Sequence, residues 1–133
     1  MSNRIPESYG DLLRDDMRAF AFLATTMPDG SPRVTPLWFD IDGENVCVNM
    51  ARGRTKDRNI AARPKVALAI MDPSNPYRYV QIRGTVVETR EQGAVDHIRR
   101  LSHKYRGTPE FAIPTGQVRV TLRIRPDRVS AQG

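Results

Sequence analysis

Residues 21–50 read AFLATTMPDGSPRVTPLWFDIDGENVCVNM and alternate between strand-forming runs and tight turns. The run over 21–27 is apolar and typical of a buried strand, and the DG pair that follows it is a strong hairpin signal. A second strand is predicted over 33–41, and a second tight turn then leads to a third strand over 46–50. Short strands joined by hairpin turns predict an antiparallel sheet.

The rest of the chain adds three strands and three helices to this sheet. Strands are predicted over 65–72, 79–89 and 117–131, where every second residue from Val118 to Ile124 is expected to face the core. Helical spacing of apolar residues predicts short helices over 6–20 (with Ser8 as N-cap), 55–62 and 91–105. Six short strands with few helices favour a mainly β barrel with peripheral α-helices, in one domain spanning residues 1–133.

Composition narrows the class of protein. The formal net charge is +6, carried by 18 Arg and 3 Lys that are scattered except over residues 52–58, where no aromatic side chains interleave them. Nucleic-acid binding is therefore an alternative that we do not favour, because steering of a small anion explains the charge as well. The sequence has no apolar run long enough for a membrane span and no apolar signal region, so a cytoplasmic protein without membrane contact is expected.

Side chains that could perform catalysis unaided are scarce. His97 and His103 are six residues apart, so they lie on different faces of the predicted helix and are interpreted as solvated, with no metal site. Cys47, the only cysteine, has no basic sequence neighbour and is interpreted as a buried structural thiol. Asp40 and Asp42 are interpreted as solvated. No catalytic residue is identified, and any redox chemistry is expected to belong to a bound cofactor.

The stretch ARGRTKDRN at 51–59 gathers cations at the start of a predicted helix. A helix N-terminus carries partial positive charge, so each cation there is unfavourable by roughly 0.3–1 kcal/mol. Gly53 permits a sharp path from strand to helix, and Thr55 is a suitable N-cap or anion-facing hydroxyl. A phosphate site formed with Arg54 and Lys56 explains this charge, whereas a solvated basic loop is the alternative. Asn59 is expected either to bond a ligand or to face solvent.

Two tyrosines, Tyr77 and Tyr79, follow a Pro-rich loop at the entry to the strand over 79–89. Aromatic side chains at such a position either pack at the rim of the protein or stack on a planar ring, including across a dimer interface. The residues alone leave both interpretations open.

The chain resembles the pyridoxamine-phosphate-oxidase-like split-barrel family, and within it the deazaflavin-dependent reductases that use coenzyme F420. The resemblance is carried by the succession from FLATTMPDGSPRV through ARGRTKDRN to YVQIRGTVVE, and later by HIRRLSHKYRG. It implies a six-stranded antiparallel split barrel of Greek-key, FMN-binding type. It also implies a homodimer with cofactor sites between the subunits.

The resemblance also implies which residues hold the cofactor. Arg54, Thr55 and Lys56 would bind its phosphate, with Arg58 and Asn59 close by, and Met50 and Arg52 would line the site. The strand that carries VTPLW would run along the ring, and the partner subunit would lend its two tyrosines. The full set is Thr35, Pro36, Leu37, Trp38, Met50, Arg52, Arg54, Thr55, Lys56, Arg58, Asn59, Tyr77 and Tyr79.

The function implied is an oxidoreductase that uses reduced F420 to transfer a hydride to a small organic acceptor. The alternatives are an FMN-dependent oxidase or reductase of the same fold and a non-catalytic deazaflavin carrier. The C-terminal RVSAQG lacks the basic and histidine residues with which vitamin oxidases hold their substrate phosphate, so that activity is not expected. Haem is not expected either, since no histidine lies in a candidate pocket.

Overall fold

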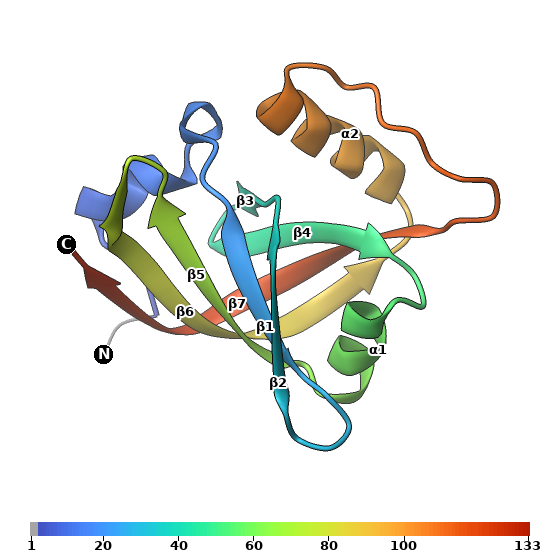
Figure 1. Ribbon diagram of the computed structural model, residues 1–133, viewed down its shortest axis with the longest axis horizontal. Helices are drawn as coiled ribbons and strands as arrows, with labels where there is room; N and C mark the ends of the chain where they lie inside the picture. The colour runs from blue at the N-terminus through green and yellow to red at the C-terminus, as the bar shows by residue number, and fades with distance from the viewer. Residues whose placement is uncertain (1–2) are drawn as a thin grey trace.

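The computed structural model of the chain describes residues 3–133 and contains one curled antiparallel sheet (Figure 1). Its seven strands are ordered β2-β1-β5-β6-β7-β4-β3, so β2 and β3 lie at the two edges. The predicted mainly β fold is confirmed. The strands are β1 (Ala21–Thr26), β2 (Pro32–Leu37), β3 (Asp40–Asp42), β4 (Asn45–Ala51), β5 (Lys65–Asp72), β6 (Asn75–Arg90) and β7 (Arg119–Gln132).

Two α-helices pack on the outside of the curled sheet (Figure 1). Helix α1 (Thr55–Ala62) joins β4 to β5 and packs against β1, and α2 (Ala94–Arg106) joins β6 to β7 and packs against β4 and β7. These helices match the ones predicted over 55–62 and 91–105. Within residues 3–133, no helix has the length and apolar character needed to cross a membrane.

The helix predicted over residues 6–20 is wrong. The segment forms two short 3-10 helices, η1 (Glu7–Leu13) and η2 (Asp15–Met17), separated by Arg14 in an extended conformation. Ser8 is not a cap, since Pro6 precedes η1 and no side chain caps it. Gly10 weakens a regular helix here, but Leu12 still reaches the core and is fully buried.

The strand predicted over 33–41 is two strands, β2 and β3. Phe39, between them, is fully buried, and its backbone bonds to α2 side chains instead of to a neighbouring strand. Its N–H lies 3.3 Å from the Tyr105 hydroxyl, and its carbonyl oxygen accepts a hydrogen bond of 2.7 Å from Lys104 Nζ. Helix α2 therefore divides the predicted strand into two, so the sheet has seven strands instead of the six predicted.

The core lies on the concave face of the sheet and follows the predicted alternation. On β7, Val120, Leu122 and Ile124 are fully buried. Val118 was expected to join them, but it is 43% exposed because β7 begins only at Arg119. The buried core is otherwise made of apolar side chains from β1, β4, β5, β6, η1 and α1, together with Ala19 and Phe39.

Arg78 ties the β5–β6 hairpin to η1. Its guanidinium donates to Asp11 Oδ1 at 2.6 Å and to Asp72 Oδ2 at 3.0 Å, and it lies over the Tyr9 ring. Hydrogen bonding to Arg78 lowers the pKa of Asp11, and hydrogen bonds from Ser74, followed by Arg78, lower that of Asp72. Because these carboxylates have pKa values below their unfolded value of 3.8, their contribution to stability is present above pH 4 and is lost as pH falls through the folded pKa values.

We expect Arg78→Met to lower the unfolding temperature at pH 7, and we expect this loss to shrink as pH falls from 3.8 to about 2. Over that range, protonation of Asp11 and Asp72 in the folded state removes the ion pairs in the wild type as well. Thermal unfolding of both proteins from pH 7 down to about pH 2 measures the difference. An equal loss at both ends of that range would mean that packing on Tyr9, rather than charge, is the contribution of Arg78.

Candidate functional site

The conformation of the turn between β4 and α1 depends on Gly53 and Asp57. Gly53 has φ +85°, a conformation that other residues rarely adopt, and its N–H donates to Asp57 Oδ2 at 2.7 Å. Arg54 occupies the N-cap position with no capping side chain, and Thr55 is the first helical residue. Of the two roles predicted for Thr55, that of N-cap is therefore wrong, and that of an anion-facing hydroxyl stays a prediction. The first-turn N–H groups have no side-chain cap.

Four cations meet around this turn, and we call them the cation cluster: Arg33, Arg54, Lys56 and Arg119. Lys56 is half-buried, and its pKa is lowered first by burial and then by the charges of Arg33 and Arg54. The pKa of Arg119 is lowered by burial and by Arg54. Among residues 3–133, no carboxylate forms an ion pair with any member of this cluster. The positive charge of the cluster is therefore not compensated by a carboxylate among the described residues.

Arg33 and Arg119 were not predicted from the sequence. Arg33 lies on β2 directly opposite Thr25, and Arg119 begins β7, so only the fold brings them to α1. The alternation of side chains along a strand could have placed Arg33 on the same face as Thr35. No local sequence pattern, however, indicates that Arg33 or Arg119 lies near residues 54–56.

Arg119 is positioned by a buried polar network. Its Nε donates to Asn49 Oδ1 at 2.9 Å, and Asn49 Nδ2 donates to the Ala94 carbonyl at 2.8 Å and to His97 Nδ1 at 3.2 Å. His97 Nε2 lies 2.8 Å from Asp40 Oδ1. Since Nδ1 accepts from Asn49, the proton of neutral His97 sits on Nε2 and is donated to Asp40.

The interpretation of His97 and Asp40 as solvated is wrong. His97 is 3% exposed and Asp40 is half-buried, whereas His103 is exposed as predicted. Cys47 is buried as predicted, and burial raises its pKa to about 11, although Arg123 lies 3.9 Å from its sulfur. No group of three or more metal-ligating side chains occurs in the described part of the chain.

Thr35 faces the interior from the edge strand β2 with its hydroxyl unsatisfied. It lies opposite Leu23, next to the Thr25–Arg33 pair that borders α1. Its Oγ1 is buried and has no hydrogen-bond partner within residues 3–133. A buried hydroxyl without a partner costs about 1–3 kcal/mol, so a ligand group at this position would recover that cost.

The free edge of β2 is rich in acceptors. Pro32 and Pro36 pair with Thr26 and Phe22 of β1, but they have no N–H to donate across that pair. These prolines and Val34 between them therefore direct their backbone groups away from β1. The open edge presents three carbonyl oxygens and a single N–H, that of Val34. Pro36 is tolerated in β2 because this strand lies at an edge of the sheet.

Trp38 stands at the end of β2 in an aromatic stack. Its ring lies parallel to Tyr105, at 5.4 Å between centroids, and meets Phe111 edge to face at 6.3 Å. Arg119 lies 5.4 Å from the Phe111 centroid, which joins the stack to the cation cluster. Tyr105 donates to the Ala19 carbonyl at 2.6 Å, and burial raises its pKa, so its hydroxyl is structural.

Several predicted site residues serve the fold in this chain. Asn59 neither faces solvent nor reaches outward: it is 2% exposed and donates to Thr25 Oγ1 at 3.1 Å. Met50 is in the core. Arg52 pairs with Glu91 at 2.9 Å, and Arg58 donates to the Gly53 carbonyl. Leu37 is half-buried against the core, and Thr55 is half-buried beside the cation cluster.

Tyr77 and Tyr79 lie away from the cation cluster. Tyr79 pairs with Met71 near the far end of β5, roughly 20 Å along that strand from its α1 end. Tyr77 is 80% exposed, and the Tyr79 hydroxyl donates to Gln132 Oε1 at 2.9 Å. In one chain these tyrosines do not reach the site, so their predicted role depends on a second copy.

Comparison with known proteins establishes the family. The sequence profile described as pyridoxamine 5'-phosphate oxidase matches residues 11–133. The chain belongs to this family. It is also 36% identical to a solved structure named F420 reductase, with a TM-score of 0.82, over 95% of this chain and 98% of the other. The split-barrel fold expected from the resemblance is thus confirmed.

More distant structures of the same fold include HupZ of group A Streptococcus and a conserved hypothetical protein of Mycobacterium tuberculosis. HupZ is 19% identical over 96% of this chain and 93% of its own, with a TM-score of 0.69. The mycobacterial protein is 19% identical over 99% and 88%, with a TM-score of 0.71. A search of curated proteins found no match. Members of the pyridoxamine 5'-phosphate oxidase family bind FMN or F420, so this chain is a flavin- or deazaflavin-binding protein.

Proposed function

We propose that this protein binds coenzyme F420 and uses its reduced form to reduce a small organic acceptor. The observation that carries the proposal is the cation cluster. Its Lys56 is half-buried, has a pKa lowered by this burial and by the charges of Arg33 and Arg54, and forms no ion pair with a carboxylate in residues 3–133. A phosphate diester supplies the missing negative charge. The choice of F420 over FMN is supported by the 36% identity to the F420 reductase.

The residues present fit such a cofactor. Arg54 and Lys56 flank the N-terminus of α1, where they and the first-turn N–H groups would hold the phosphate. Arg33 and Arg119 would add charge from β2 and β7, and Thr35 Oγ1 would donate its unused hydrogen bond. When bound, the deazaflavin supplies a carbon that donates hydride, and this chain supplies no redox group of its own.

The ring is placed along β2 in this proposal. The edge of that strand offers carbonyl acceptors and the N–H of Val34, which suit a planar ring that carries both carbonyl and N–H groups. Trp38, held parallel to Tyr105, would stand at the end of this strand edge and exclude water from the ring.

A homodimer completes the site in this proposal. The partner subunit would lend Tyr77 and Tyr79, which are displaced from the cation cluster within one chain. The exposure of Tyr77, 80%, supports this role, since large exposed aromatic side chains favour interfaces.

Turnover separates a reductase from a carrier protein. We expect catalytic amounts of the protein to oxidise reduced F420 in the presence of at least one acceptor from a panel of quinones, enones and nitroaromatics. The oxidation of reduced F420 is measured as an increase in the absorbance of oxidised F420. Tight binding of F420 without oxidation by any acceptor in the panel would instead identify a carrier.

A further inference from the structure

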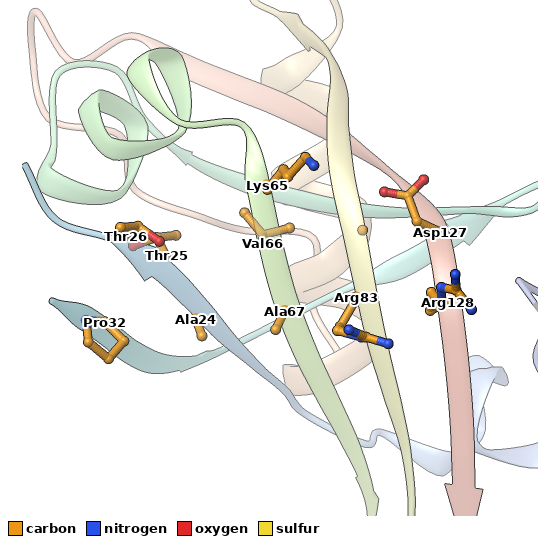
Figure 2. A pocket seen from close by; sticks show the side chains of 11 residues that line it. Ala24, Thr25, Thr26, Pro32, Lys65, Val66, Ala67, Arg83, Asp127 and Arg128 are labelled. Carbon is orange, nitrogen blue, oxygen red and sulfur yellow. The ribbon is translucent and has the colours of Figure 1, made fainter. Parts of the chain in front are cut away.

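A second basic cavity lies on the outer face of the sheet, across β1, β5, β6 and β7 (Figure 2). Its volume is about 510 Å³. Its lining includes the small residues Ala24, Ala67 and Gly84. The cations Lys65, Arg83 and Arg128 also line it. Small side chains between three cations leave room for a ligand rather than for packing.

None of the three cations forms an ion pair within residues 3–133, although the charge of Lys65 acts on Asp127 at the cavity. Arg83 and Arg128 lie directly opposite each other on β6 and β7. Lys65 on β5 is paired with Thr85, which follows Arg83 by two residues on β6. Like charges in directly opposite positions destabilise a sheet. Within residues 3–133, no ion pair or side-chain hydrogen bond is made by any of the three. The one carboxylate at the cavity, Asp127, already accepts from Thr85 at 2.6 Å and from Arg125 at 3.0 Å.

A β-bulge between β6 and β7 lies at the cavity. Arg83 pairs with Arg128 while Gly84 pairs with Pro126, so Asp127 is the extra residue of the bulge. A side chain at position 84 has no room, since a Cβ there would lie 2.6 Å from the Arg125 carbonyl oxygen. Position 84 therefore faces the buried Ile124, and the register at the bulge sets Arg83 and Arg128 opposite each other at the edge of the cavity.

We propose that this cavity binds a small oxyanion of the phosphate or carboxylate class, at a site separate from the cation cluster. Each guanidinium group can donate two parallel hydrogen bonds to a pair of oxygens of such an anion, and Lys65 adds a third charge. The two sites lie at opposite ends of α1: Arg54 precedes its first residue, and Lys65 follows its last by three positions. An eight-residue helix places its ends about 12 Å apart.

Titration with inorganic phosphate tests this site. The titration is made in full-length Arg54→Ala/Lys56→Ala protein, so that anion binding at the cation cluster, where Arg33 and Arg119 remain, is weakened. We expect phosphate binding measured by calorimetry to weaken about tenfold in Arg83→Gln or Arg128→Gln, and to be lost when both are changed. Arg99→Gln, which removes an exposed arginine of α2, is the matched control and should leave phosphate binding unchanged.

Two further measurements identify the source of the anion. F420 titration of Arg83→Gln/Arg128→Gln should match the wild type if the anion is a separate molecule. A weakened F420 affinity would show that the cavity holds an anionic part of the cofactor itself. Unchanged phosphate binding in the double variant overturns the proposal. If sedimentation shows that the double variant has lost a dimer while its phosphate binding is unchanged, the arginines serve a subunit interface instead. None of these phosphate results depends on F420 being the cofactor.

Discussion

Replacing both Arg54 and Lys56 by alanine is expected to weaken F420 binding by at least 100-fold. Each side chain would make a charge-assisted hydrogen bond to the cofactor phosphate, and each such bond contributes about 1.5–3 kcal/mol. Fluorescence titration of the double variant against the wild type measures this loss. Arg33 and Arg119 would retain part of the affinity, because they approach the same turn from other strands.

The same double variant should fold as well as the wild type or slightly better without cofactor. Burial and the neighbouring charges of Arg33 and Arg54 already lower the pKa of Lys56, so its removal relieves repulsion. Urea unfolding of the cofactor-free proteins checks this. Arg99→Ala/Arg100→Ala removes two exposed cations from α2 and controls for net charge. Normal F420 binding by the Arg54→Ala/Lys56→Ala protein would show that the phosphate lies elsewhere.

His97→Leu is expected to lower the free energy of unfolding by about 3 kcal/mol, because unsatisfied buried polar groups cost about 1–3 kcal/mol each. The change leaves Asp40, Asn49 and Thr121 without their histidine partner. We also expect weaker F420 binding, since Asn49 is the residue that positions Arg119. Urea unfolding and fluorescence titration measure the two effects.

His103→Leu is the matched control for His97. It changes the same residue type on the same helix, but His103 is exposed, so stability and binding should stay near wild type. Equal stability losses in the two variants would contradict the role assigned to the buried network.

Local patterns in the sequence were sufficient for most of the fold. Alternation placed Val120, Leu122 and Ile124 in the core, and the DG turn correctly joined β1 to β2. The errors occurred where another part of the chain competes with a local preference. Helix α2 bonds to the backbone of Phe39 and divides a predicted strand, and the N-terminal segment forms 3-10 turns against the core.

The candidate site was half predictable. Arg54 and Lys56 are close in sequence, and the strand–glycine–helix context indicated an anion site around them. Arg33 and Arg119 come from distant strands, and buried His97 contacts Asp40, which lies on β3 and far from it in the sequence. Such partners are set by topology, which a single sequence does not specify at the level of side chains.

The identity of the cofactor is the central claim, and a parallel titration of the wild-type protein with F420, FMN and FAD tests it most directly. The account predicts that F420 binds most tightly and that its affinity depends on Arg54 and Lys56. Tighter binding of FMN or FAD, or the absence of binding by all three, would contradict it.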